Sequence, residues 1–298
     1  MPNKEEISQY FQGLQDSICK ELELADGNIK FREDNWQRAE GGGGRSRTVA
    51  KGNIIEKGGV GFSAVWGQLH PKMVQSMNLS EKTDFFATGV SIVIHPNSPM
   101  VPIIHMNVRY FELENGECWF GGGIDLTPHY VDESDASWFH TQLKNACDAH
   151  DSAYYPKFKP WADDYFYSPH REETRGIGGI FFDYQKPNQE KNKAQIFEFV
   201  KSVGEAFAPI YTHFMAKNAQ TPFTENEKNW QLLRRGRYVE FNLVHDRGTK
   251  FGLETNGRTE SILMSMPPTA NWIYDYQVIK NSDEEKTLSL LKKGINWI

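Results

Sequence analysis

Cysteine is scarce in this sequence. Among its 298 residues there are 3 cysteines, Cys19, Cys118 and Cys147, which lie far apart and form no CxxC pair. An odd number of widely spaced cysteines argues against a disulfide framework, and the missing CxxC pair argues against a cysteine zinc site. We therefore expect a protein of a reducing compartment.

Long apolar runs and an excess of positive charge are also missing. No apolar segment approaches the roughly 20 residues that a helix needs to span a bilayer, so we expect no membrane span. The N-terminal stretch MPNKEEISQYFQ is too polar for a signal peptide. The net charge of −6 and the isoelectric point of about 5.9 argue against general nucleic-acid binding. These features predict a cytoplasmic protein with no nucleic-acid partner, in which an anionic ligand must be bound by a local cluster of arginines.

The glycine-rich segments do not complete a nucleotide-binding motif. GGGGRSRT at 41–48 lacks the Gly-Lys-Ser/Thr sequence that ends a P-loop. GIGGIF at 176–181 has Phe181 where a dinucleotide-binding fingerprint needs its third glycine. Both segments therefore argue against a nucleotide cofactor.

Aromatic residues are plentiful, at 13%, and hydrophobic residues reach 39%, which favours an ordered domain of enzyme size. Helical spacing of apolar residues or helical composition predicts helices over 4–24, 134–150, 156–167, 194–215 and 283–298, with Pro209 interrupting the fourth. A capping box at 224–227 predicts that a further helix begins there. Strands are expected over 85–94, 101–113, 118–126 and 178–184, and a second hairpin over 237–257.

Hairpins join the expected strands more often than helical crossovers do. This arrangement predicts an α+β fold with a mainly antiparallel sheet flanked by helices, rather than a doubly wound sheet. We find no repeat and no clear domain boundary, so residues 1–298 are expected to form a single domain. The tetraglycine stretch at 40–48 is interpreted as a flexible break within that domain, and it is our candidate for a mobile segment.

One expected strand carries an unusual set of polar residues. Side chains alternate across a strand, so His105, Asn107 and Arg109 share one face, and Ser91 and His95 share a face of the preceding strand. A solvent-facing side of a sheet is the simpler interpretation. Such faces usually carry Lys, Glu and Thr, however, so the choice of His, Asn and Arg favours a surface that binds a ligand.

Histidines raise the alternative of a metal site. A proline-rich connection could bring His95 and His105 together, and His140 and His170 are further candidate ligands. His140 lies on an expected helix with Leu143, a setting more typical of a core histidine. Spacing alone favours no metal, and a four-histidine site stays open as the alternative.

Arginine is the side chain best suited to bind carboxylates, because its fork matches their two oxygens. Arginines cluster at expected strand ends and glycine turns, which suggests a substrate with several carboxylates. They are Arg45, Arg47, Arg109, Arg234, Arg235, Arg237 and Arg258. Asp125 follows three glycines, which allow a flat ligand to approach the backbone closely, and it could act as a base or an orienting acceptor. A β-bulge followed by a turn is the alternative interpretation of this stretch.

Six segments between residues 35 and 268 together resemble the oxygen-dependent coproporphyrinogen III oxidase family. The segments are NWQRAEGGGGRSR, HPNSPMVPIIHMNVRYFE, FGGGIDLTPHY, RGIGGIFFD, LLRRGRYVEFNLVHDRGT and TNGRTESILMSMPP. The resemblance implies oxidative decarboxylation of two propionates of coproporphyrinogen III to vinyl groups, giving protoporphyrinogen IX in haem biosynthesis. It also implies a large flat antiparallel sheet covered by helices and a homodimer with contacts around Tyr238 to Trp272.

The resemblance further implies that O2 is the co-substrate and that no organic cofactor is needed, since a reduced tetrapyrrole is electron-rich enough to react with O2. His105 is similar to the family's proposed proton donor, and Asp125 to the carboxylate proposed to engage the pyrrole N–H groups. Arg109 would hold a propionate or stabilise a peroxide intermediate. The substrate-contacting positions would be Ser91, Asn107, Val108, Arg109, Asn256, Gly257 and Arg258. His95, His105, His140 and His170 match positions proposed as ligands of a divalent metal in bacterial members.

Two other classes of protein remain as alternatives. A non-haem metal oxygenase would use the same histidines on another carboxylated substrate, and chelation would abolish its activity. A porphyrin-binding carrier would bind a tetrapyrrole without releasing CO2, and replacing Asp125 would change little. The joint presence of His105, Arg109 and Asp125 argues against the carrier.

Overall fold

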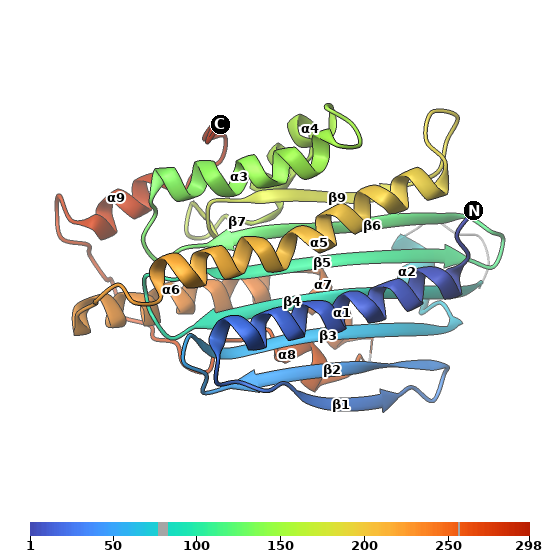
Figure 1. The fold of residues 1–298 in the computed structure, drawn as a ribbon, viewed down its shortest axis with the longest axis horizontal. Helices are drawn as coiled ribbons and strands as arrows, with labels where there is room; N and C mark the ends of the chain where they lie inside the picture. Colours follow the sequence, from blue (N-terminus) through green and yellow to red (C-terminus); the bar gives the residue numbers. More distant parts are fainter. Residues whose placement is uncertain (77–82, 256) are drawn as a thin grey trace.

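A seven-stranded antiparallel sheet forms the centre of the protein (Figure 1). The structure is a computed structural model that describes residues 1–76, 83–255 and 257–298. The strand order is β1-β2-β3-β4-β5-β6-β9, so all neighbours except β6 and β9 are consecutive in the chain. The strands are β1 (Arg32–Gln37), β2 (Gly42–Ala50), β3 (Ile55–Gln68), β4 (Asp84–Pro96), β5 (Ile103–Leu113), β6 (Cys118–Thr127) and β9 (Gly179–Gln185). A separate two-stranded sheet pairs β7 (Tyr167–Ser168) with β8 (Glu173–Thr174).

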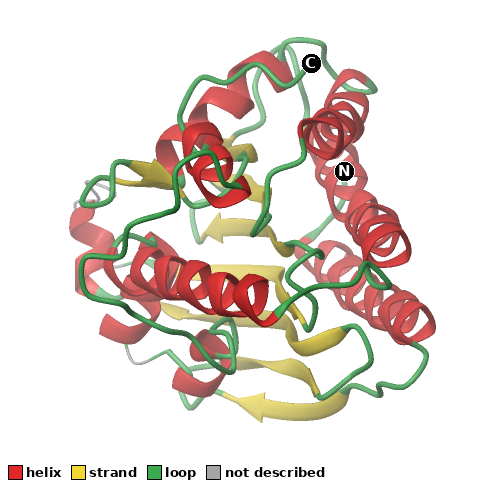
Figure 2. Cartoon of the chain, turned by 90° about the vertical axis from the view of Figure 1, so that its left-hand side faces the viewer, coloured by secondary structure: helices red, strands yellow, loops and turns green. Residues whose placement is uncertain are grey.

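Helices cover both faces of the large sheet (Figures 1 and 2). The helices on one face are α1 (Lys4–Asp26), α3 (Glu133–Asp148) and α5 (Lys193–Asn218). The helices on the other face are α6 (Glu225–Val244), α7 (Arg247–Glu254) and α8 (Thr259–Leu263). The remaining helices are α2 (Pro71–Ser76), α4 (Tyr154–Tyr165), which packs along β9, and α9 (Asp283–Leu290). The predicted α+β fold with an antiparallel sheet between helices is confirmed.

Alternation along the strands gives the two faces of the sheet different characters. In β5, Ile104, Met106 and Val108 are fully buried against the layer that contains α1 and α5. The intervening residues His105 and Asn107 point to the face beneath α6 and are only partly buried. The apolar core therefore lies on the α1 and α5 side, and the polar residues singled out in the sequence lie on the opposite side.

Capping boxes of side chains close the N-terminal ends of two helices. Thr224 caps α6 and Glu227 completes the capping box that the sequence predicted. Asn3 and Glu6 form the same motif at the start of α1. Because these contacts satisfy N–H groups that have no partner within the helix, they fix where α1 and α6 begin.

The interpretation of 40–48 as a flexible break is wrong. Residues Gly42–Ala50 form β2, which pairs with both β1 and β3. A Cβ atom at Gly44 would lie 2.3 Å from Cζ2 of Trp36, so a larger residue would collide with the indole ring. Here glycine permits close packing of a side chain on the strand, and it does not indicate mobility.

The hairpin predicted over 237–257 is also wrong, because the described residues of this segment lie mainly in two helices, α6 up to Val244 and α7 over Arg247–Glu254. The alternation in RYVEFNLV has the period of a strand, but the buried residues Arg234, Tyr238 and Phe241 follow helical spacing on α6. Tertiary burial of this helical face outweighs the strand propensity of its aromatic and β-branched residues. The helix that begins at Thr224 therefore continues to Val244, and α7 follows it.

Pro209 does not interrupt α5, which runs from Lys193 to Asn218. The residues around the proline, including Phe207, Ile210 and Tyr211, are almost fully buried in the main core. Their packing keeps the helical turns on both sides of Pro209 in place, although the proline has no N–H group to donate to the helix. None of the helices in the described part of the chain is both long and apolar enough to cross a membrane.

Candidate active site

The sheet face beneath α6 and α8 is lined by glycines. Strand register places Gly61, Ser91, Asn107 and Gly123 opposite one another in one row across β3 to β6. The next row contains Ser63, Gly89, Arg109 and Gly121, and the row on the other side contains Gly59, Val93, His105 and Asp125. We call Gly59, Gly61, Gly89, Gly121 and Gly123 the glycine floor. Gly61 and Gly89 are partly exposed, so a flat ligand can approach the backbone closely there, whereas Gly59, Gly121 and Gly123 are buried beneath neighbouring groups.

Part of the glycine floor is open to solvent. Ser91 is exposed although β4 is the central strand of the sheet, and Asn107 and Arg109 are only partly buried. Over β3 the floor is covered by Met264, whose Sδ would lie 2.8 Å from a Cβ at Gly59. The open area therefore lies over β4 and β5, beside Met264, which directly follows α8.

A buried carboxylate lies at one side of the floor. Asp125 is 1% exposed, and its Oδ1 accepts hydrogen bonds from Nη2 of Arg175 at 2.6 Å and from the His105 ring at 2.8 Å. Arg175 Nε donates to the second oxygen of Asp125 at 3.2 Å, which makes the pair bidentate. Burial alone would raise the pKa of Asp125, but the charge of Arg175 and the hydrogen bond from His105 hold it below its usual value. Asp125 is therefore ionised at neutral pH.

Arg175 is enclosed by aromatic rings. Its guanidinium carbon lies 4.4, 4.8 and 4.9 Å from the ring centroids of Phe166, Tyr238 and Phe241. Nη1 of Arg175 donates to Oδ1 of Asn242 at 2.7 Å. Burial tends to lower the pKa of Arg175, yet the charge of Asp125 raises it above its ordinary value. The aromatic cage and the carboxylate together fix a permanent positive charge below the site.

His105 joins this buried pair to the open face. Its side chain is 21% exposed, whereas that of Asp125 is 1% exposed. Its Nδ1 lies 2.8 Å from Asp125, and its ring packs edge-on against Phe166. When Nδ1 is bonded to a carboxylate in this way, Nε2 is left to exchange a proton with a ligand. The structure thus brings together two of the three predicted catalytic residues.

The third predicted catalytic residue, Arg109, lies on the same strand, four positions after His105. Its Nη1 donates to Oδ1 of Asn107 at 2.9 Å, and its Nη2 lies 2.9 Å from Oδ2 of Asp183. A Cβ at Gly121 would lie 2.9 Å from Nε of Arg109, so the guanidinium lies directly over the floor. Arg109 is thereby positioned to meet a carboxylate of a ligand on this face.

The other predicted substrate-contacting residues have different positions. Arg258 precedes α8, and its Nη2 lies 2.5 Å from Asp34 of β1. Gly257 donates its N–H to the carbonyl of Gly252 in α7. The Val108 side chain is fully buried in the core on the other side of the sheet, which leaves only its backbone for a ligand. The prediction for Asn256 falls outside the described residues.

The four histidines predicted as metal ligands have separate hydrogen-bond partners. His95 Nε2 bonds the carbonyl of Ser265 at 2.8 Å, and both nitrogens of His140 are engaged, by the Tyr155 hydroxyl and the carbonyl of Ile177. Burial lowers the pKa of His95 to about 3 and that of His140 to about 4, so both are neutral at pH 7.

The fourth histidine, His170, lies at the surface, with one ring nitrogen 2.9 Å from His245 and the other 3.0 Å from Glu240. Within residues 1–76, 83–255 and 257–298, no three His, Cys, Asp or Glu side chains are grouped to hold a metal ion. The four histidines therefore do not fit a single ion in this arrangement, and no step of the chemistry below is assigned to one.

Several site residues were not predicted from the sequence. Arg175 precedes β9, and Asp183 lies within it. Tyr238 and Asn242 lie on the part of α6 that was interpreted as a hairpin. Arg175 directly precedes the glycine-rich stretch that was rejected as a nucleotide motif. A charged residue next to Gly176 and Gly178 was the one signal that could have drawn attention to it.

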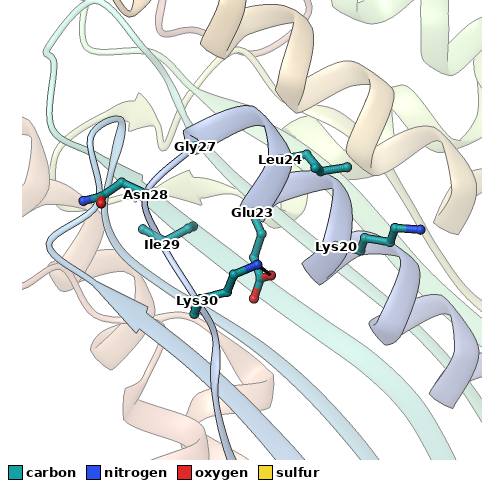
Figure 3. Close-up of a pocket in the computed structure, with 7 residues that line it drawn as sticks. All are labelled: Lys20, Glu23, Leu24, Gly27, Asn28, Ile29 and Lys30. Carbon is teal, nitrogen blue, oxygen red and sulfur yellow. Dashed lines mark hydrogen bonds and ion pairs between the residues drawn. The ribbon is translucent and has the colours of Figure 1, made fainter.

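Two hollows elsewhere on the surface contain none of these residues. A hollow of about 370 Å³ lies at the C-terminal end of α1, where Lys30 Nζ is 2.6 Å from Glu23 (Figure 3). A second, of about 500 Å³, is lined by β1 to β3 and includes Arg38, Gly43 and Trp66. Neither includes His105 or Asp125, so the chemistry of the glycine floor defines the candidate site.

An open glycine floor with a buried Asp–Arg pair, a histidine and surface arginines is suited to an enzyme that binds a flat, carboxylated substrate. Comparison with known proteins gives the family. The profile described as coproporphyrinogen III oxidase matches residues 6–297. The chain therefore belongs to the coproporphyrinogen III oxidase family.

Individual relatives agree with this assignment. The oxygen-dependent coproporphyrinogen-III oxidase of Drosophila melanogaster is 50% identical over 299 residues, which cover 96% of this chain and 76% of the fly protein. The protein of that name from Prochlorococcus marinus strain MIT 9301 is 46% identical over 319 residues, covering 99% of this chain and 93% of the relative. The one from strain NATL2A is 48% identical over 307 residues, covering 95% and 88%.

Proposed function

We propose that this chain is an oxygen-dependent coproporphyrinogen III oxidase of haem biosynthesis. It converts two propionates of coproporphyrinogen III to vinyl groups and yields protoporphyrinogen IX. For each propionate, one O2 and one proton are consumed, and one CO2 and one H2O2 are released. The observation that carries the proposal, beside family membership, is the Asp125–His105 pair at the edge of an open glycine floor.

Substrate binding follows from the shape and charge of the floor. The tetrapyrrole lies over β4 and β5, where Gly89 adds no side chain and Ser91 is exposed, and it meets the side chains of Arg109 and Asp183 beside Gly121. Arg109 and Arg258 bind propionates, and Ser91 and Asn107 supply polar contacts between them. The Arg–carboxylate bond is charge-assisted, so it fixes the register of the ring on the floor as well as adding affinity.

Proton transfer is assigned to His105. Asp125 is almost fully buried and its oxygens are engaged by Arg175 and His105, so His105 presents the exchangeable group to the substrate. Asp125 orients the ring through its bond to Nδ1, and Arg175 keeps Asp125 ionised. His105 Nε2 then exchanges a proton with a pyrrole N–H or with the departing peroxide. The role of Asp125 is thus to act through His105 rather than to contact the pyrroles directly.

We assign the electrons for O2 reduction to the tetrapyrrole itself. Breaking the propionate C–H and C–C bonds releases CO2 and leaves the new vinyl group, while O2 receives the two electrons and becomes H2O2. No organic cofactor is required for this balance, and the protein contributes binding, orientation and proton handling.

A second copy of the chain is the proposed partner, with contacts around Tyr238 to Trp272. Tyr238 itself is buried, but large apolar side chains nearby are exposed, namely Leu243, Val244, Phe251, Leu253 and Trp272. Apolar exposure on this scale favours association. Light scattering of the purified protein tests it, and a monomeric mass at micromolar concentration would contradict it.

The proposed function is tested with His105→Gln, a variant that leaves the buried Asp125–Arg175 pair intact. We expect kcat for coproporphyrinogen III to fall about 10²–10⁴-fold, because the proton carrier is lost, with KM nearly unchanged. His70→Gln changes an exposed histidine outside the site and is the matched control. Turnover by His105→Gln within threefold of the wild type would contradict the assignment.

A further inference from the structure

Each of the two substrate-facing arginines is already paired with an acidic residue of the protein. Nη2 of Arg109 lies 2.9 Å from Oδ2 of Asp183, and Nη2 of Arg258 lies 2.5 Å from Oδ2 of Asp34. Both acids face the glycine floor. A Cβ at Gly121 would lie 2.5 Å from Oδ1 of Asp183, and Asp34 lies in the same cross-strand row as Gly61.

Each arginine also has a neutral partner that can hold it in place. Asn107 accepts from Nη1 of Arg109 at 2.9 Å, and Ser261 accepts from Nη1 of Arg258 at 3.0 Å. An arginine that is also held by an amide or hydroxyl group can exchange one carboxylate partner for another without moving. The same two-part arrangement thus occurs at two separate places on one face.

Asp183 and Asp34 are exposed enough to solvent to separate from their arginines. The side chains of Arg109 and Asp183 are 36% and 22% exposed, and those of Arg258 and Asp34 are 30% and 43% exposed. Ion pairs with this exposure add little to stability, because solvent screens the two charges. The Asp125–Arg175 pair differs in kind, because its side chains are 1% and 2% exposed. That pair is a fixed part of the site, whereas the two outer pairs are exchangeable.

We propose that Asp183 and Asp34 are internal carboxylates that occupy Arg109 and Arg258 in the free protein and are displaced by propionates of the substrate. This inference rests on the proposed function and deepens it. A tetrapyrrole with propionates at the right positions replaces each aspartate by an equivalent group. When a propionate becomes a vinyl group, it can no longer hold the arginine, and the aspartate takes its place again. Because the aspartates compete for the two arginines, only a substituent that carries a carboxylate binds there.

The test is the affinity of Asp183→Asn for coproporphyrin III, the oxidised tetracarboxylate, and for its tetramethyl ester, each measured by fluorescence titration. We expect Asp183→Asn to bind the tetracarboxylate about three- to tenfold more tightly, because the competing charge is gone, and to bind the ester as the wild type does. In turnover, KM for coproporphyrinogen III falls and kcat does not rise. Asp34→Asn is expected to act in the same direction.

Asp164→Asn is the matched control. Asp164 is an exposed acid on α4 that pairs with Lys293, so its replacement changes the net charge equally but away from the floor. Equal or weaker binding of the tetracarboxylate by Asp183→Asn, relative to both the wild type and this control, would overturn the exchange while leaving the enzyme assignment intact. A wild-type protein that fails to convert coproporphyrinogen III in air would overturn both.

Discussion

At the scale of residues, the site depends on how burial and charge are balanced at Asp125. An isolated carboxylate at 1% exposure would be costly, and Arg175 offsets this cost with a bidentate pair that is itself enclosed by Phe166, Tyr238 and Phe241. The sequence identified Asp125 and His105 as candidates because of their residue types and neighbours. It could not pair Arg175 with Asp125, because a partner 50 positions away is known only once β6 and the segment before β9 are adjacent.

Replacing Arg175 by Met tests this balance. The variant keeps the side-chain volume but leaves Asp125 buried without a countercharge, so we expect the free energy of unfolding to fall by about 3–5 kcal/mol. Urea unfolding followed by circular dichroism measures the change. In the double variant Arg175→Met/Asp125→Asn the loss should be smaller, because neither charge remains.

Arg171→Met serves as the comparison for this prediction. Arg171 is 38% exposed and pairs with Glu240 at the surface, so its replacement should cost about 1 kcal/mol or less. If Arg175→Met unfolded at the same urea concentration as the wild type, the buried pair would not have the role assigned to it.

At the scale of elements, β4, β5, β6, β9 and most helices were predicted because their hydrophobic periods are clear, whereas β1 and β3 were not predicted. The failures have two causes. The segment over 237–244 alternates like a strand yet belongs to α6, since its buried side is defined by contacts with other elements such as the Tyr238–His95 ring contact. The glycines of β2 were misinterpreted because close packing by Trp36 is not visible in local sequence. The floor itself appears only when the register of β3 to β6 is known.

Adding one methyl group to the floor tests its role. A Cβ at Gly121 would lie 2.5 Å from Asp183 and 2.9 Å from Arg109, so Gly121→Ala must displace both side chains. We expect kcat/KM for coproporphyrinogen III to fall about 10- to 100-fold, because misplacement of a binding group by about 1 Å has effects of this size.

Gly13→Ala is the matched glycine control. Gly13 lies on the exposed side of α1, and a Cβ there would meet nothing within 4 Å. This change should raise the free energy of unfolding by about 0.5–1 kcal/mol and leave kcat/KM unchanged. Equal kinetics for the two alanine variants would contradict the assignment of the floor to substrate binding.

At the scale of the whole molecule, the sheet has the apolar core on one face and the residues of the candidate site on the other. One face packs against α1, α3 and α5 and contains most of the apolar core, while the other carries the glycine floor, the Asp125–His105 pair and the arginines. The α+β architecture and the polar row of β5 were predictable from the sequence. The separation of the four histidines was not, because matching positions in a motif do not give the distances between side chains.

The central claim is that residues of this face and the substrate itself carry an O2-dependent decarboxylation. The most direct measurement is turnover of coproporphyrinogen III by chelator-treated protein in air and under argon, with product analysis and quantification of CO2. We expect protoporphyrinogen IX in air, with two CO2 per product molecule, and none under argon. Activity that is lost on chelation and restored only by a divalent cation would contradict the account, as would tetrapyrrole binding without CO2 release in air.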